Sequence, residues 1–198
     1  SLSPILIFKM PDNQISNELT LEKYNLQGGF YAGINNLFPG SGYIEFHKEK
    51  LFIVSSRGIL AFANKFDQDL SFHQIKNNIN KFIDIEQFRV KGASIKDLFI
   101  HDNQIYLSFT EEIKENCWNT SIIFGKIDYS EIVFSKLFSS DKCVHAYNNV
   151  DGEFEAYASG GRMAYFDDKH ILLTVGEFQN RYLAQEEDNI NGKIIKIN

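Results

Sequence analysis

The chain has 198 residues, enough for one ordinary domain with a sizeable core. Its hydrophobic content of 43% is that of a globular protein, and its 18 Phe and 9 Tyr favour strands. A formal charge of -6, a pI near 5.4 and the lack of a basic patch argue against electrostatic binding to nucleic acid or an anionic membrane. The longest apolar run is far shorter than the ~20 residues that a membrane-spanning helix needs.

Three similar hairpins recur along the chain, each made of two short apolar strands around a polar turn. They pair 43–46 with 51–55, 95–100 with 105–108, and 162–165 with 171–174. Their second strands begin at 51, 105 and 171, which are 54 and 66 residues apart. Further strand material follows each hairpin, at 59–62, at 121–124 with 132–134, and at 193–197.

Four strands per repeat at this period are what a β-propeller blade requires. We therefore predict an all-β fold, a β-propeller of about three blades that forms half of a six-bladed ring. The predicted blades lie roughly at 28–80, 90–142 and 155–198, after a strand pair at 5–10 and 19–26. A pair of β-sandwiches or a plain meander would use similar hairpins and remains an alternative. Residues 72–85 fit either a short helix or a strand with a long turn.

Two cysteines, Cys117 and Cys143, flank two strand-like runs at 120–126 and 132–138. Paired positions in a hairpin lie symmetrically about its turn, and residue 130, midway between the cysteines, falls in the turn 128–131. The thiols should therefore face each other at the separation that a disulfide demands. Two unpaired buried cysteines are the alternative. A bridge would indicate an oxidising compartment, periplasmic or secreted.

The last 40 residues carry the most specific pattern: Ser159-Gly-Gly-Arg162, then Thr174-Val-Gly-Glu177, Ala184-Gln185 and Gly192-Lys-Ile194. This pattern resembles the signature blade of the soluble glucose/sorbosone dehydrogenase family, whose six-bladed propellers use pyrroloquinoline quinone (PQQ) beside calcium. The positions that match the family pattern are Gly160, Gly161, Arg162, Thr174, Gly176, Ala184, Gln185, Gly192, Lys193 and Ile194. The resemblance implies that the chain is the N-terminal half of such a ring.

The resemblance also implies an altered catalytic centre. In the family a His accepts a proton from the sugar hydroxyl while hydride passes to the quinone, and an Asp orients that His. Ala158 occupies the His position and Glu177 the Asp position. A methyl group accepts no proton, so Glu177 is the catalytic candidate that remains. His145, thirteen residues before Ala158, is a second candidate as a displaced base, or else an exposed loop histidine.

The cofactor-binding candidates are Arg162, Arg181 and Gln185, which share the signature blade and would face an axial pocket. A structural interpretation is equally open. Gly160 and Gly161 would permit close backbone approach, Arg162 would pair with an acidic turn, and Gln185 would satisfy backbone groups between blades. No metal-ligand spacing is present in the sequence. The resemblance places the calcium ligands and most quinone-binding residues in blades beyond this chain.

Two functions follow from these observations. The first is a sugar-dehydrogenase-like propeller of the periplasm or exterior that binds carbohydrate or protein as a non-classical member. The second is a PQQ-dependent oxidoreductase of a sugar or alcohol with an atypical base. Three blades cannot close around an axis, so we expect a partner that supplies the remaining propeller half, as a second chain or a C-terminal fragment, with a homodimer as the weaker option.

Overall fold

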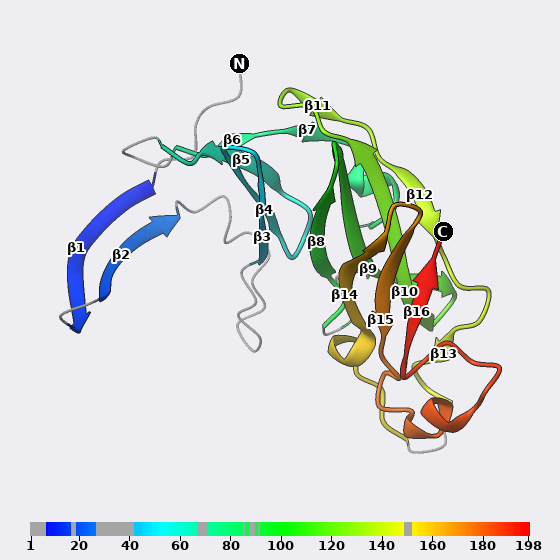
Figure 1. Ribbon diagram of the computed structural model, residues 1–198. Helices are drawn as coiled ribbons and strands as arrows, with labels where there is room; N and C mark the ends of the chain where they lie inside the picture. The colour runs from blue at the N-terminus through cyan, green and yellow to red at the C-terminus, as the bar shows by residue number, and fades with distance from the viewer. Residues whose placement is uncertain are drawn as a thin grey trace.

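Short antiparallel strands dominate the chain (Figure 1). The computed structural model describes residues 7–16, 19–26, 42–66, 71–84, 86–87, 90, 92–148 and 152–198, the first two ranges by their backbone alone. No helix among these residues is long and apolar enough to cross a membrane. The start of the first predicted blade, at 28, lies outside the described residues.

Three successive sheets contain most of the strands (Figure 1). The first consists of β3 (Gly42–His47), β4 (Lys50–Ser55), β5 (Leu60–Asn64) and β6 (His73–Gln74). The second consists of β8 (Ile95–His101), β9 (Gln104–Lys114), β10 (Cys117–Lys126) and β12 (Ser135–Phe138), with β13 (Val144–His145) also on β10. The third consists of β14 (Gly160–Asp167), β15 (His170–Val175) and β16 (Lys193–Ile197).

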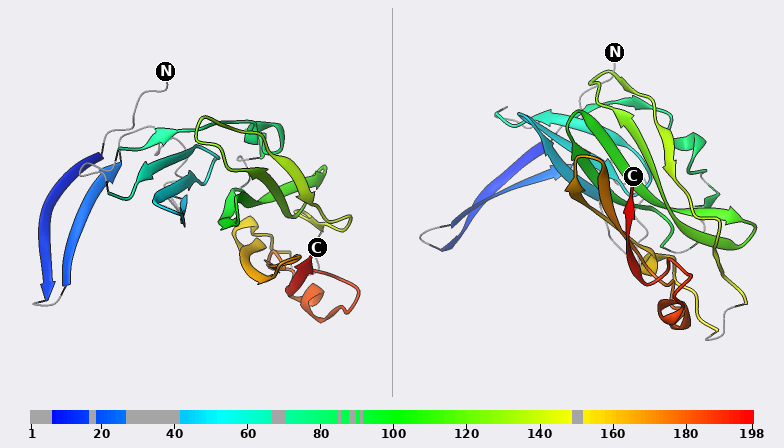
Figure 2. Two further views of the ribbon diagram at one scale, coloured as in Figure 1. Left: turned by 45° about the horizontal axis from the view of Figure 1, so that its top comes forward. Right: turned by 45° about the vertical axis from the view of Figure 1, so that its right-hand side comes forward.

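The sheets stack face to face along an arc (Figure 2). Phe52 and Val54 of the first sheet share a core with Ile105 and Leu107 of the second. A second core joins the other face of the second sheet to the third sheet, and includes Ile122, Met163, Leu173 and Val175. The first strands of the sheets, β3, β8 and β14, contact one another in turn and follow the inner side of the arc (Figure 2). The all-β prediction is confirmed, and this stacking is that of propeller blades.

Other elements depart from the sequence-based predictions. The third sheet has three strands among the described residues rather than four. The predicted N-terminal strands pair, but the first is β1 (Ile7–Ser16) rather than 5–10, while β2 (Leu19–Leu26) has the predicted bounds. The segment 72–85 forms β6, β7 (Lys76–Asn77) and a 3₁₀ turn (Ile79–Lys81), so neither predicted form is right.

Strand β7 is short because of the side chain of Asn78. β7 pairs in parallel with β11 (Glu131–Ile132) over two residues. Beyond these two residues the Asn78 side chain replaces the main-chain pairing. Its amide N–H₂ group donates to the Phe134 carbonyl at 3.0 Å, and its amide oxygen accepts from the Phe134 N–H at 2.7 Å. A side chain that forms hydrogen bonds with the main-chain groups of a strand ends the β-ladder at that point.

The predicted disulfide between Cys117 and Cys143 forms, with a Cα–Cα distance of 5.3 Å. The predicted register is wrong, however, because Cys117 lies opposite His145 rather than Cys143. Ile122 lies opposite Phe138, as the predicted symmetry requires, but Trp118 lies opposite Val144, so the break between β12 and β13 moves the pairing by two residues. The bridge spans a sequence separation of 26, and on the chain-entropy model a loop of this size stabilises the fold by about 3–4 kcal/mol.

His47 is buried where the first and second sheets meet. It is 7% exposed, its ring meets Phe52 edge-on at 6.3 Å, and neither ring nitrogen has a hydrogen-bond partner in the described part of the chain. Burial, and secondly the charge of Lys48, lowers the pKa of His47; the Asp102 main chain opposes this weakly. The neutral imidazole is therefore the form that the fold holds.

This burial predicts a pH dependence of stability. Because the folded state has the lower pKa, the unfolded chain binds more protons below about pH 6.5, and stability falls as pH drops through that value. We expect the urea midpoint to decrease between pH 7.5 and pH 5.5, and to decrease less in His47→Leu than in the unaltered chain. His145→Leu, at an exposed position, is the matched control and should keep the full decrease. An equal decrease in all three proteins would contradict the assignment.

Candidate functional site

The signature segment Gly160–Met163 begins β14 with an irregular register against β15. Gly161 has φ 107°, and a Cβ on it would lie 2.3 Å from the Cβ of Lys96 on β8. β8 is itself irregular between Ile95 and Asp97, so the extra residue Lys96 bulges toward this contact. Glycine at 161 therefore lets the inner strands of the second and third sheets approach closely, as the structural interpretation proposed.

Three hydrogen bonds close this contact, and they define the seam between the second and third sheets. The Ser108 hydroxyl donates to the Gly161 carbonyl at 2.5 Å, and the Thr120 hydroxyl donates to the Ser159 carbonyl at 2.7 Å. The Met163 N–H donates to a carboxylate oxygen of Asp97 at 2.7 Å. All three are buried, so the seam holds the signature segment rigidly.

Asp97 also binds Arg162, whose guanidinium lies 2.9 Å from the second carboxylate oxygen. The Asp97 side chain is 5% exposed and that of Arg162 is 71% exposed. Burial raises the pKa of Asp97, while the Met163 N–H and Arg162 act in the opposite direction. Arg162 therefore pairs with a carboxylate of the neighbouring inner strand rather than with an acidic turn.

Further polar side chains of the inner strands surround this pair. Tyr43 of β3 lies close enough for the charges of Asp97 and Arg162 to act on it, and burial chiefly raises its pKa. Glu45 of β3 raises the pKa of Asp97. Burial lowers the pKa of Lys96 to about 8, and its ammonium group donates to the Gly92 carbonyl at 2.7 Å.

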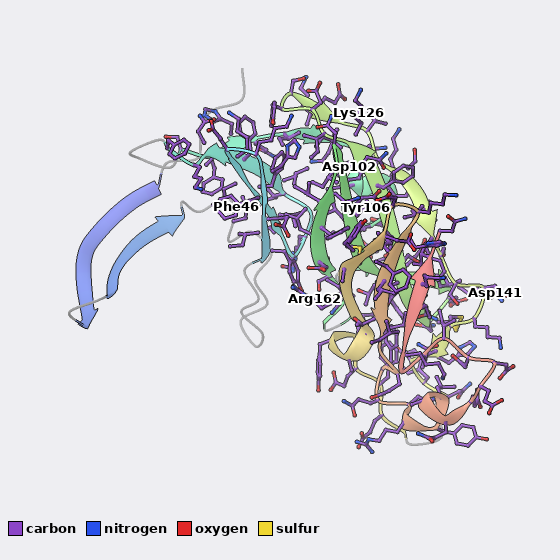
Figure 3. All side chains as sticks on the ribbon, in the orientation of Figure 1. Phe46, Asp102, Tyr106, Lys126, Asp141 and Arg162 are labelled. Atoms are coloured by element: carbon purple, nitrogen blue, oxygen red, sulfur yellow. A yellow bond between two sulfur atoms is a disulfide. The ribbon has the colours of Figure 1, made fainter. Side chains whose placement is uncertain are left out.

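We call these five residues, Tyr43, Glu45, Lys96, Asp97 and Arg162, the inner cluster. Figure 3 shows Arg162 on β14, on the side that faces β8 and β3. The cluster thus draws on the first strand of all three sheets. Its exposed guanidinium, held by a buried carboxylate, offers oriented donors to a polar ligand.

Ala158 and Glu177 lie side by side, as the resemblance implied. The Gly176 N–H donates to the Ser159 carbonyl at 2.7 Å, and the Phe178 N–H donates to the Ala158 carbonyl at 3.2 Å. Main-chain bonds on both sides of Glu177 therefore fix it beside Ala158. Phe178 and Gln179 follow with φ of 56° and 69°, an uncommon conformation for residues other than glycine.

Three buried oxygens in this region have no hydrogen-bond partner in the described part of the chain. They belong to the Ser159 hydroxyl, one oxygen of the Glu177 carboxylate and the Asn180 amide. Buried polar atoms are normally satisfied, so unpaired ones call for water or a ligand. Glu177 is thus the carboxylate that lies next to Ala158, and it stays a catalytic candidate.

The remaining predicted site residues lie in separate surroundings. His145 is exposed on β13, against β10 and away from the inner strand β8. Arg181 is in the 3₁₀ turn η5 (Arg181–Gln185), 67% exposed and 3.5 Å from Glu153. Gln185 ends the same turn and is exposed. None of these three has a contact with the Asp97–Arg162 pair among those of the described residues.

Sequence reasoning missed four residues of the inner cluster: Tyr43, Glu45, Lys96 and Asp97. The signal was present at 95–98, where Lys96 and Asp97 interrupt an apolar strand. Two adjacent charges in an otherwise apolar strand need partners if the strand is buried. The partner of Asp97, Arg162, was a candidate because of the family resemblance and not because of these two charges.

The described residues do not by themselves fit a quinone or a calcium ion. No group of three or more His, Cys, Asp or Glu side chains among them could hold a metal. PQQ carries several carboxylates, which require several cationic partners, and the inner cluster offers one exposed cation, Arg162, because Lys96 is buried against Gly92. We therefore derive no chemical step through either group.

Stacked antiparallel sheets with a polar inner edge define this protein as a β-propeller. The family profile described as "Glucose / Sorbosone dehydrogenase" matches residues 44–198. The chain belongs to this family, in which PQQ dependence is general. A comparison with curated proteins gave no match.

Solved structures with the same fold carry related names. A "glucose dehydrogenase" aligns with a TM-score of 0.59 at 17% identity, over 79% of this chain and 46% of its own length. A second glucose dehydrogenase gives 0.57 at 18%, over 78% and 43%. The soluble aldose sugar dehydrogenase of Escherichia coli, in its apo form, gives 0.57 at 17%, over 78% and 43%. These confirm the propeller fold, and the chain spans less than half the length of each.

The close approach at Gly161 predicts a large effect of one methyl group. Gly161→Ala should destabilise the protein by about 1–3 kcal/mol more than Gly152→Ala, because overpacking a buried contact costs that much. Gly152 is the matched control: its φ is also positive, at 66°, but nothing lies within 4 Å of its Cβ position. Urea unfolding of both variants measures the difference. Equal losses would show that backbone conformation, rather than the seam, makes Gly161 necessary.

Proposed function

We propose that this chain is a sugar-dehydrogenase-like propeller that binds a carbohydrate at its inner cluster, as a non-classical member of its family. The observation on which this proposal rests is the methyl group of Ala158 beside Glu177. The signature segment is present, but the position that the resemblance assigns to the catalytic base holds an alanine. The names of the similar structures, glucose and aldose sugar dehydrogenase, support a sugar as the ligand class.

The inner cluster has the chemistry that this ligand needs. Arg162 presents several N–H donors in a fixed plane, and the carboxylate of Glu45 accepts from hydroxyls. Because Asp97 holds Arg162 in place, little side-chain entropy is lost when a hydroxylated ring binds. The disulfide supports a periplasmic or secreted setting, since such bridges persist in oxidising compartments.

The test combines binding and turnover, on the chain purified in whatever assembly it forms. We expect saturable binding of D-glucose or another aldose by titration calorimetry, weakened about tenfold or more in Arg162→Ala, as for loss of a charged hydrogen bond. Arg181→Ala is the control and should leave affinity unchanged. Dye-linked assay with PQQ and Ca²⁺ should show no turnover above background. Absence of binding, or equal effects of the two arginine variants, would refute the proposal.

A second function, a quinone-dependent oxidoreductase with an atypical base, is favoured by one observation. The Glu177 carboxylate has an unpaired buried oxygen beside Ala158 and could accept a proton there. Turnover in the same dye-linked assay that is lost in Glu177→Gln would establish this function instead. Ala158→His would then be expected to raise the rate.

We also propose that a further part of the propeller packs against the outer face of the third sheet. Phe166 and Ile194 on that face are 51% and 68% exposed. Each apolar side chain that stays uncovered forgoes roughly 1.5–3 kcal/mol of burial. Additional blades, from a second chain or a continuation of this one, would cover them, as in a closed ring.

Light scattering on the purified chain tests this assembly. We expect a species heavier than the 22.8 kDa of one chain, and we expect Ile194→Glu to lower its mass. Tyr147→Glu, at a position that is 79% exposed on a loop of the second sheet, is the control and should not change the mass. A well-folded, soluble species of 22.8 kDa would contradict the proposal.

A further inference from the structure

A second concave site lies at the opposite end of the seam from the inner cluster. It is a pocket of about 130 Å³ between the second and third sheets, at the turns β8–β9 and β14–β15. β14 runs from Arg162 at one end to Asp167 at the pocket. At roughly 3.3 Å per residue these two positions are about 16 Å apart. Figure 3 shows Asp102 and Tyr106 near one end of the strands and Arg162 near the other.

The inner wall of this pocket is apolar and partly aromatic. Tyr106 and Phe124 lie on adjacent strands with ring centroids 6.2 Å apart and planes inclined by 21°. Leu137 and Ile171 complete this wall from the two sheets. Flat, electron-rich ring faces attract the weakly positive C–H groups of a ligand.

The rim of the pocket is polar and is held in place by its own hydrogen bonds. Asp168 accepts from the Tyr165 hydroxyl at 2.9 Å, and Asp167 accepts from the Lys169 N–H at 2.9 Å. The His170 ring lies 2.6 Å from the same oxygen of Asp167. These contacts use one oxygen of each carboxylate, so the other oxygen can accept from a ligand. Gln104, whose amide oxygen accepts from Tyr106 at 3.1 Å, supplies an N–H₂ donor.

The chemistry of wall and rim selects the ligand. The rim carries Asp167 and Asp168 beside Lys169 and His170, so it offers both acceptors and donors to the hydroxyl groups of a neutral ligand. The volume is close to the roughly 150 Å³ of a cavity that holds one benzene ring, so the ring of one monosaccharide fits and its hydroxyls would lie at the polar rim. An apolar wall with a few convergent polar groups is the usual form of a small-molecule site.

We propose that this seam pocket is a second binding site, for one neutral monosaccharide ring. The C–H face of the ring lies on Tyr106 and Phe124, and its hydroxyls donate to Asp167 and Asp168 and accept from Gln104. The site stands on observations separate from the inner cluster, so it does not depend on the function proposed above.

Histidine signals in NMR spectra provide the test, because two of the five histidines, His101 and His170, line the pocket. Titration with D-glucose, D-galactose and D-xylose should shift the ring C–H signals of these two in a saturable manner, and leave His145 unchanged. Arg162→Ala should not alter these shifts, which separates this site from the inner cluster.

Two variants address the rim directly. Asp168→Ala should weaken the binding about tenfold or more, and Gln104→Ala by about 2–10-fold, as expected for losing a charged and a neutral hydrogen bond. Asp141→Ala and Gln74→Ala, at exposed positions elsewhere, are the matched controls and should bind as the unaltered chain does. Thermal unfolding checks that each variant is folded.

Three results would overturn the proposal. In the first, none of the three sugars shifts the signals of His101 and His170. In the second, the shifts persist at unchanged affinity in both rim variants. In the third, the shifts disappear in Arg162→Ala, which would mean that they report binding at the inner cluster.

Discussion

The buried carboxylate of Asp97 is the constraint on which the seam between the second and third sheets depends. A carboxylate that is 5% exposed must be paired, or its desolvation would cost several kcal/mol. The Met163 N–H and the Arg162 guanidinium pair with its two oxygens, and both belong to β14. The register and the position of β14 against β8 therefore follow from one acidic residue. Gly161 permits this position, because any larger residue would meet Lys96.

The same constraint explains where the seam pocket lies. Strands of a sheet twist, so two sheets that are held tightly at one end of their inner strands diverge toward the other end. Asp97 and Gly161 hold the sheets together near the start of β14, and the pocket opens at the turns where β14 and β8 end. Tyr106 and Phe124 partly fill the space, which is why its inner wall is aromatic.

The sequence predicted local pairing well, because the three hairpins depend on alternation and turn residues a few positions apart. It identified the disulfide partners but not their register, since the break between β12 and β13 has no local signature. Asp97 was missed because its partners lie 65 and 66 positions along the chain, and no local pattern indicates which sheet face will meet which. The segment 72–85 was missed for a similar reason: Asn78 binds Phe134, 56 residues away.

The contacts around Ala158 explain how the signature segment keeps its position although residue 158 has no side chain that can accept a proton. Main-chain bonds from Gly176 and Phe178 hold the segment, and the glycines and the Asp97 pair position it; none of these contacts involves the side chain at 158. The identity of the side chain at 158 can therefore change without disturbing these contacts. The buried carboxylate oxygen of Glu177, unpaired among the described residues, is one polar atom that the fold leaves in this region.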